Sequence, residues 1–74
     1  MIKDNEQKLM IEKFDFFYNE RVPVHIKKLN GEWLNGNLID RRSDSVFVID
    51  EKLKGHVTIF VSEVKDVDKL RDIE

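Results

Sequence analysis

The stretch VHIKKLNGEWLNGNLID, residues 24–40, contains the features that decide the fold. At its start, Val24 and Ile26 alternate with polar residues, which is typical of a half-buried β-strand. The dipeptide Asn30-Gly31 follows, and it is the strongest short signal for a β-hairpin in the chain. The stretch therefore predicts two antiparallel strands, the first at about residues 22–29.

The second strand of this hairpin is expected at residues 32–41 and contains a glycine in its middle. Gly36 predicts a sharp bend or bulge, which a small barrel needs in order to close. Alternation places Leu34, Gly36 and Leu38 on one face and Trp33, Asn35, Asn37 and Ile39 on the other. Trp33 either covers the end of the barrel beneath a helix or is a partly exposed contact.

Short apolar runs continue after the hairpin. The pattern predicts a turn at 42–45, a strand at 46–49, a loop at 50–55, a strand at 57–61, a break at 62–63, a short strand at 64–67 and a charged tail at 69–74. The run from Val46 to Ile49 is apolar on both faces, so we expect the helix or another subunit to cover it.

Residues 4–19 are predicted to form a helix, with Asp4 as its N-cap and Gln7 completing a capping box. One apolar stripe runs along this helix and consists of Met10, Phe14 and Phe17, widened by Ile11 and Tyr18. The stripe either packs on the barrel or binds a partner protein. Residues 1–74 are thus expected to be one domain, mainly β with an N-terminal α-helix and a five-stranded, strongly bent antiparallel sheet.

Length, net charge and cysteine content limit the classes of function that this chain can have. A chain of 74 residues buries a thin core and often gains stability by oligomerising. Its formal net charge of −2 argues against a dedicated duplex-DNA binder, which more often carries a large positive excess. Cysteine is absent, so disulfides and thiolate sites are excluded. No apolar run approaches the roughly 18 residues that span a bilayer, and the N-terminus is too polar for a signal peptide. We expect a cytoplasmic protein.

The hairpin and the segments around it resemble the Sm-like family (Sm, LSm and Hfq). The resemblance covers about residues 21–68 and is carried by Val24, Ile26, Leu29, Gly31, Gly36 and Leu38. The segment HVTIFVSEVKDV, residues 56–67, is similar in shape to the second motif of the family. The resemblance implies an open barrel beneath an N-terminal helix, assembly into a homomeric ring of about five to seven subunits, and binding of single-stranded RNA, as in an RNA chaperone.

The positions that bind RNA in the family differ here. The Asp and the base-binding Asn that follow the bent-strand Gly fall on Arg42 and Val46, or on Asp40 and Asp44 if the turn is two residues shorter. The Arg-Gly pair of the second motif is missing. The Tyr-Lys-His of Hfq falls on Phe60, Val61 and Ser62, so only the aromatic residue is retained.

The candidate RNA-binding residues are Arg41, Arg42, Asp44, Phe60 and Ser62. Arginine pairs with phosphate and stacks on bases, and a ring would multiply the two arginines into a basic collar around its pore. The alternative is that they are solvated turn residues balanced by nearby aspartates. The candidate ring-interface residues are Val46, Phe47, Val48, Ile49, Val57, Ile59, Phe60 and Val61.

The remaining polar residues indicate no chemistry. His25 and His56 lack ligand-like partners, and no Ser-His-Asp set or glycine-rich phosphate loop is present. We therefore expect no enzyme activity, metal, cofactor, small-molecule substrate or membrane partner. Four lysines, Lys27, Lys28, Lys52 and Lys54, form either a peripheral basic patch or a solubilising surface. A second hypothesis is that a Sm-like or Tudor-like barrel serves as a protein-interaction or scaffold module without binding RNA.

Overall fold

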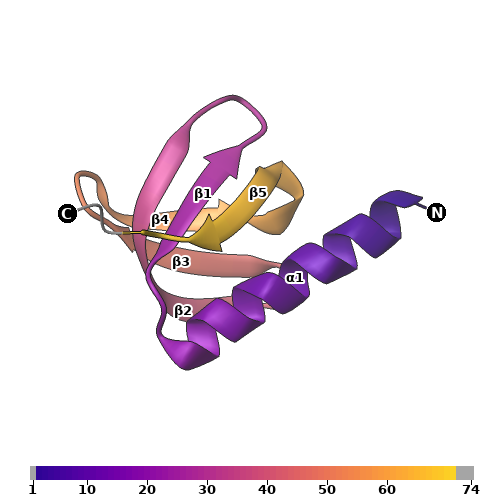
Figure 1. The fold of residues 1–74 in the computed structure, drawn as a ribbon, viewed down its shortest axis with the longest axis horizontal. Helices are drawn as coiled ribbons and strands as arrows, with labels where there is room; N and C mark the ends of the chain where they lie inside the picture. Colours follow the sequence, from indigo (N-terminus) through magenta and orange to yellow (C-terminus); the bar gives the residue numbers. More distant parts are fainter. Residues whose placement is uncertain (1, 72–74) are drawn as a thin grey trace.

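The structure is a computed structural model that describes residues 2–71, with side chains from residue 7 onward. It is mainly β, with one N-terminal helix and a curved five-stranded antiparallel sheet (Figure 1). The elements are α1 (Ile2–Glu20), β1 (Val24–Lys28), β2 (Trp33–Ser43), β3 (Val46–Glu51), β4 (Gly55–Phe60), the 3-10 turn η1 (Val61–Glu63) and β5 (Val64–Lys69). The strand order is β4-β3-β2-β1-β5, so the sheet is not closed and β4 and β5 are its two edges. The expected fold class is confirmed at this level.

The β1–β2 hairpin turns at Asn30-Gly31, as predicted. Gly31 has a φ of 91°, a conformation that glycine adopts without steric cost. Its N–H donates to the carbonyl of Lys28 at 3.0 Å, and the Asn30 side chain accepts the N–H of Glu32 at 2.9 Å. The local hydrogen bonds of these two residues therefore fix the register in which β1 and β2 pair.

Gly36 is the residue of β2 that pairs with both neighbouring strands, β1 and β3. It lies opposite Val24 of β1 and opposite Glu51 of β3. A Cβ atom at this position would overlap the carbonyl oxygen of Asp50 and lie 3.1 Å from the Cα of Glu51. Only glycine permits this close backbone approach. The register shifts of β2 lie further on, between Leu38 and Asp40 and between Arg41 and Ser43, and not at Gly36.

The apolar stripe of α1 packs on the sheet, which decides between its two alternatives. Phe14 is fully buried, and its ring stacks on that of Phe47 in β3, with centroids 5.0 Å apart. Tyr18 approaches the same Phe47 ring edge-on, at 6.3 Å. Met10 and Phe17 are partly buried against the same cluster. The helix begins at Ile2, so the prediction of Asp4 as its N-cap is wrong.

The core lies between α1 and the concave face of the sheet. Its buried residues are Phe14, Val24, Ile26, Leu34, Leu38, Phe47, Ile49, Ile59, Val61, Val64 and Val67. Phe47 and Ile49 belong to this core, so part of the cover expected for Val46–Ile49 comes from within the subunit. The first turns of α1 extend beyond the strands (Figure 1), and within residues 2–71 no helix has both the length and the apolar character needed to cross a bilayer.

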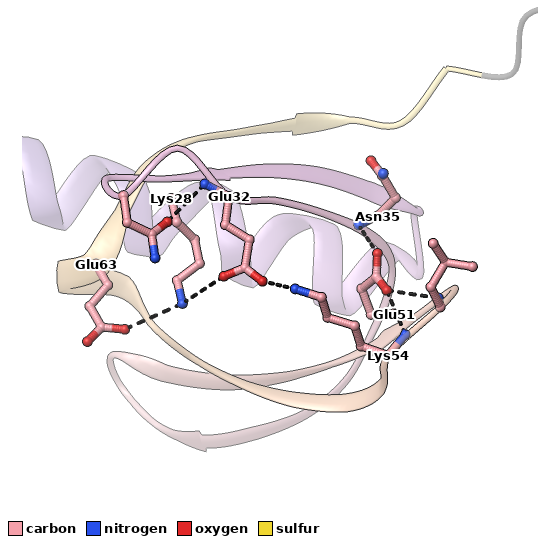
Figure 2. Close-up of polar contacts among 8 residues, drawn as sticks. Lys28, Glu32, Asn35, Glu51, Lys54 and Glu63 are labelled. Atoms are coloured by element: carbon pink, nitrogen blue, oxygen red, sulfur yellow. Dashed lines mark hydrogen bonds and ion pairs between the residues drawn. The ribbon is translucent and has the colours of Figure 1, made fainter.

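A buried carboxylate, Glu51, holds the loop between β3 and β4 (Figure 2). Its Oε1 accepts the N–H groups of Leu53 and Lys54 at 2.8 and 2.9 Å, and its Oε2 accepts that of Asn35 at 3.1 Å. The hydrogen bonds from Leu53, Asn35 and Lys54 lower the pKa of Glu51 below its ordinary value of 4.5. Composition and spacing gave no sign of this role.

The lowered pKa of Glu51 predicts that acid weakens the fold. Its ionised form stabilises the native state fully above about pH 4.5, and this contribution is lost as the pH falls through the lower native pKa. We expect Glu51→Gln to lower the free energy of unfolding at pH 7 and to differ less from the wild type at pH 3. Urea unfolding at both pH values measures this, with Glu12→Gln on the exposed face of α1 as the control. A deficit in Glu51→Gln that is equal at both pH values would contradict it.

A chain of ion pairs joins three loops beside Glu51 (Figure 2). Lys28 lies 3.6 Å from Glu32 and 3.9 Å from Glu63 of η1, and Glu32 also pairs with Lys54 of the β3–β4 loop. Two of the four lysines considered as a basic patch are therefore neutralised by these carboxylates. These ion pairs hold the loops at one end of the sheet together.

Candidate nucleic-acid interface

The candidate arginines lie on β2, just before the tip of the β2–β3 hairpin. Register shifts at Ile39 and Arg42 keep β2 paired with β3 as far as Ser43, which lies opposite Val46. The predicted turn at 42–45 is therefore shorter than expected, because two bulges absorb the extra residues and let the strand continue. Arg41, by contrast, pairs directly with Phe47.

Phe60 lies beside this hairpin tip. It is opposite Val46 in the β3–β4 ladder, and the next residue, Val61, donates its N–H to the carbonyl of Ser45 at 2.9 Å. The Phe60 side chain is 47% exposed, on the face opposite Ile59, as strict alternation predicts. Arginine and aromatic side chains thus come from neighbouring segments at one end of the sheet.

Ser62 belongs to a different part of the surface. As the middle residue of η1, it is exposed and lines a shallow groove with Gln7, Met10 and Leu29. The groove runs between α1 and the start of the β1–β2 loop. Arg41, Arg42, Asp44 and Phe60 therefore lie near the hairpin tip, whereas Ser62 does not. Arg41 shares a face of the sheet with its ladder partner Phe47, and Phe60 lies on the opposite face, so the structure does not bring these two side chains together.

Each arginine at the tip is paired with carboxylates of its own chain. The Nε of Arg41 is 3.0 Å from Asp15 of α1, and one of its terminal nitrogens is 3.3 Å from Asp44. The Nε of Arg42 is 3.0 Å from Asp40. Solvent screens these pairs because every partner is at least one-third exposed. A phosphate that uses the Nε–H donor of Arg41 or Arg42 therefore has to compete with an aspartate.

The structure divides the candidate ring-interface residues into two groups. The side chains of Phe47, Ile49, Ile59 and Val61 are in the core of the subunit, and Val48 is also buried. The four core side chains are covered by α1 and the curvature of the sheet, so they are not presented to a neighbouring subunit. Val48 alternates with Phe47 and Ile49 and lies on the opposite face, where it is also buried. Val46 and Val57 are half-buried and Phe60 is exposed, so these three retain surface for a contact.

Pairing with the neighbouring strand determines which main-chain groups of the edge strands β4 and β5 point outward. In the β3–β4 ladder, the bond from Val61 to Ser45 directs the N–H and C=O groups of Thr58 and Phe60 to the free edge. At the opposite edge, the N–H of Leu70 donates to the carbonyl of Pro23. This bond directs the N–H and C=O groups of Val67 and Lys69 outward. Both edges therefore offer unpaired donors and acceptors.

Trp33 lies on the convex face and not beneath the helix. Its ring stacks on that of His25, with centroids 4.1 Å apart, and the Nζ of Lys27 is 5.2 Å from the Trp33 centroid. His25 is held by a hydrogen bond from its Nδ1 to the side-chain oxygen of Asn35. Trp33 remains 47% exposed, so it is the partly exposed contact of the two alternatives.

Among the described side chains, no group of three or more His, Cys, Asp or Glu residues is placed to hold a metal ion. In comparisons with known proteins, no family model and no curated protein matches the chain.

Proposed function

We propose that this protein is an Sm-like subunit that assembles into a homomeric ring of about five to seven copies and binds single-stranded RNA at the hairpin tip. The observation that carries the proposal is the pair of free edges in a bent sheet of order β4-β3-β2-β1-β5. A contact between two different edges is heterologous, so it repeats from copy to copy and closes into a ring when the rotation allows.

The composition of β4 supports this assembly. Its sequence, GHVTIF, contains no Lys, Arg, Asp, Glu or Pro, the residues with which natural proteins block an exposed edge. Thr58 and Phe60 direct main-chain groups outward from this strand. Such an edge is a template for another strand, and β5 of a second copy is the strand that the proposal places there.

The RNA-binding part of the proposal rests on Arg41, Arg42 and Phe60. Ring symmetry would repeat these residues around a common axis and so multiply the guanidinium donors available to one RNA strand, although the aspartates paired with the arginines are repeated with them. Arginine supplies phosphate contacts, and an exposed phenylalanine supplies a surface for base stacking.

The double variant Arg41→Ala/Arg42→Ala tests this site. We expect the affinity for a fluorescent oligouridine to fall by at least about tenfold, because two charged donors are lost from each subunit. The slope of log K against log salt should become shallower by about 1.4, since each single-strand phosphate contact contributes about 0.7. Fluorescence anisotropy at several salt concentrations measures both quantities.

The matched control is Lys8→Ala/Lys52→Ala, which removes two exposed cations away from the tip. Its affinity should stay within about threefold of the wild type. If the two double variants lose affinity equally, RNA contacts the protein through general charge and the proposed site at the tip is wrong.

A scaffold role without RNA is the second candidate, and α1 provides the observation that favours it. Leu9 and Phe16 are 61% and 59% exposed, on the side of α1 that does not face the sheet. An exposed apolar pair on a helix is a common contact for a partner protein. Rings that form but do not bind oligouridine would favour this candidate.

A further inference from the structure

Asp15 forms an ion pair with Arg41, the arginine on which the proposed RNA site depends. The Nε of Arg41 lies 3.0 Å from a carboxylate oxygen of Asp15, and its other contacts are Asp44 at 3.3 Å and the ring of Phe47, whose centroid is 5.9 Å from the guanidinium carbon. Asp44 is almost fully exposed, whereas the side chain of Asp15 is two-thirds covered. Asp15 is therefore the better-placed partner of Arg41.

The position of Asp15 is set by the packing of α1. Phe14, the residue before it, is fully buried and stacks on Phe47, which is the direct ladder partner of Arg41. The same contact that docks the helix thus brings the Asp15 carboxylate to the hairpin. The ion pair joins two residues that are more than twenty positions apart in the sequence.

Carboxylate and phosphate use the same guanidinium donors. We infer that Asp15 is an internal competitor of RNA: a phosphate that takes the Nε–H donor of Arg41 must first displace the Asp15 carboxylate. This inference rests on the proposed function. It makes Asp15 a positioning residue that sets affinity at the tip without itself contacting RNA.

The competition has a reciprocal consequence for α1. If Asp15 weakens RNA binding through Arg41, bound RNA must weaken the Asp15–Arg41 contact by the same factor. Amide hydrogens of α1 around Asp15 should therefore exchange faster in the RNA-bound protein than in the free protein.

The experiment compares the wild type with Asp15→Asn, Asp15→Glu and Asp50→Asn, using a fluorescent oligouridine and the full chain. Exposed ion pairs of this kind are weak, so we expect Asp15→Asn to bind oligouridine up to about fivefold more tightly. Asp15→Glu, which restores the charge, should return toward wild-type affinity. Asp50 is exposed in β3 away from the hairpin tip. Its Asn variant makes the same change in net charge and controls for that change.

The outcomes separate this inference from the proposed function. Tighter binding by Asp15→Asn than by Asp50→Asn supports the inference, including the case in which only Asp15→Asn binds. Equal affinities of these two variants, with binding still weakened in Arg41→Ala/Arg42→Ala, overturn the inference and leave the proposed function standing. Absence of binding by every variant overturns both.

If circular dichroism shows that Asp15→Asn is misfolded, hydrogen exchange of the wild type with and without oligouridine replaces it. Faster exchange of the α1 amides around Asp15 in the bound protein supports the inference. Unchanged exchange in a protein that binds oligouridine overturns it.

Discussion

Replacing Gly36 with alanine is expected to destabilise the fold by about 3 kcal/mol or more, because the new Cβ meets backbone and not a movable side chain. It would overlap the Asp50 carbonyl oxygen and lie 2.9 Å from the Asp50 carbonyl carbon. To relieve the overlap, β2 and β3 must separate where the sheet bends. The thermal midpoint should fall by more than about 10 °C, as measured by circular dichroism.

Gly31→Asn is the matched control for this prediction. At Gly31 a Cβ meets no atom within 4 Å, and asparagine tolerates the positive φ better than most residues do. The expected cost is below about 1 kcal/mol. If both glycine variants lose the same small amount of stability, the close approach at Gly36 is not what shapes the sheet.

If the protein forms the proposed ring, Thr58→Pro is expected to convert it into a monomer of about 8.8 kDa. Proline removes an N–H that points to the free edge of β4, while the β3–β4 ladder keeps the bonds made by Val57 and Ile59. The proline ring also obstructs the approach of a second strand. Size-exclusion chromatography with light scattering measures the mass.

Thr58→Ala is the control at the same position, because it shortens the side chain and keeps the N–H. It should assemble like the wild type. A Thr58→Pro protein that is folded and still has the wild-type mass would show that the β4 edge is not the contact, and the head-to-tail ring would have to be abandoned.

Much of the fold was predictable because its signals are local. Asn30-Gly31 can form its turn from its own hydrogen bonds, and the alternation around Gly36 follows from the two-residue period of a strand. The apolar spacing of α1 likewise specifies which face is buried. Only the ends of elements were misplaced, as at Ile2 and at the β2–β3 turn, where bulges lengthened the strand.

The polar contacts at the candidate site could not be predicted from the sequence. The pairing of Asp15 with Arg41 depends on how α1 docks against the hairpin, and no spacing rule relates residues so far apart. Glu51 is one acid among fifteen, and only the path of the β3–β4 loop brings three N–H groups to it. The apolar run Val46–Ile49 indicated burial correctly but not whether the cover came from the same subunit.

The measurement that tests the central claim most directly is native mass spectrometry of the full chain, with and without a short oligouridine. The proposal predicts a single oligomer of about five to seven subunits whose mass increases by one or more oligonucleotides. A monomer at the concentrations where Sm-like assembly is expected would contradict the ring. A ring whose mass does not change with oligouridine would contradict RNA binding and leave the scaffold role.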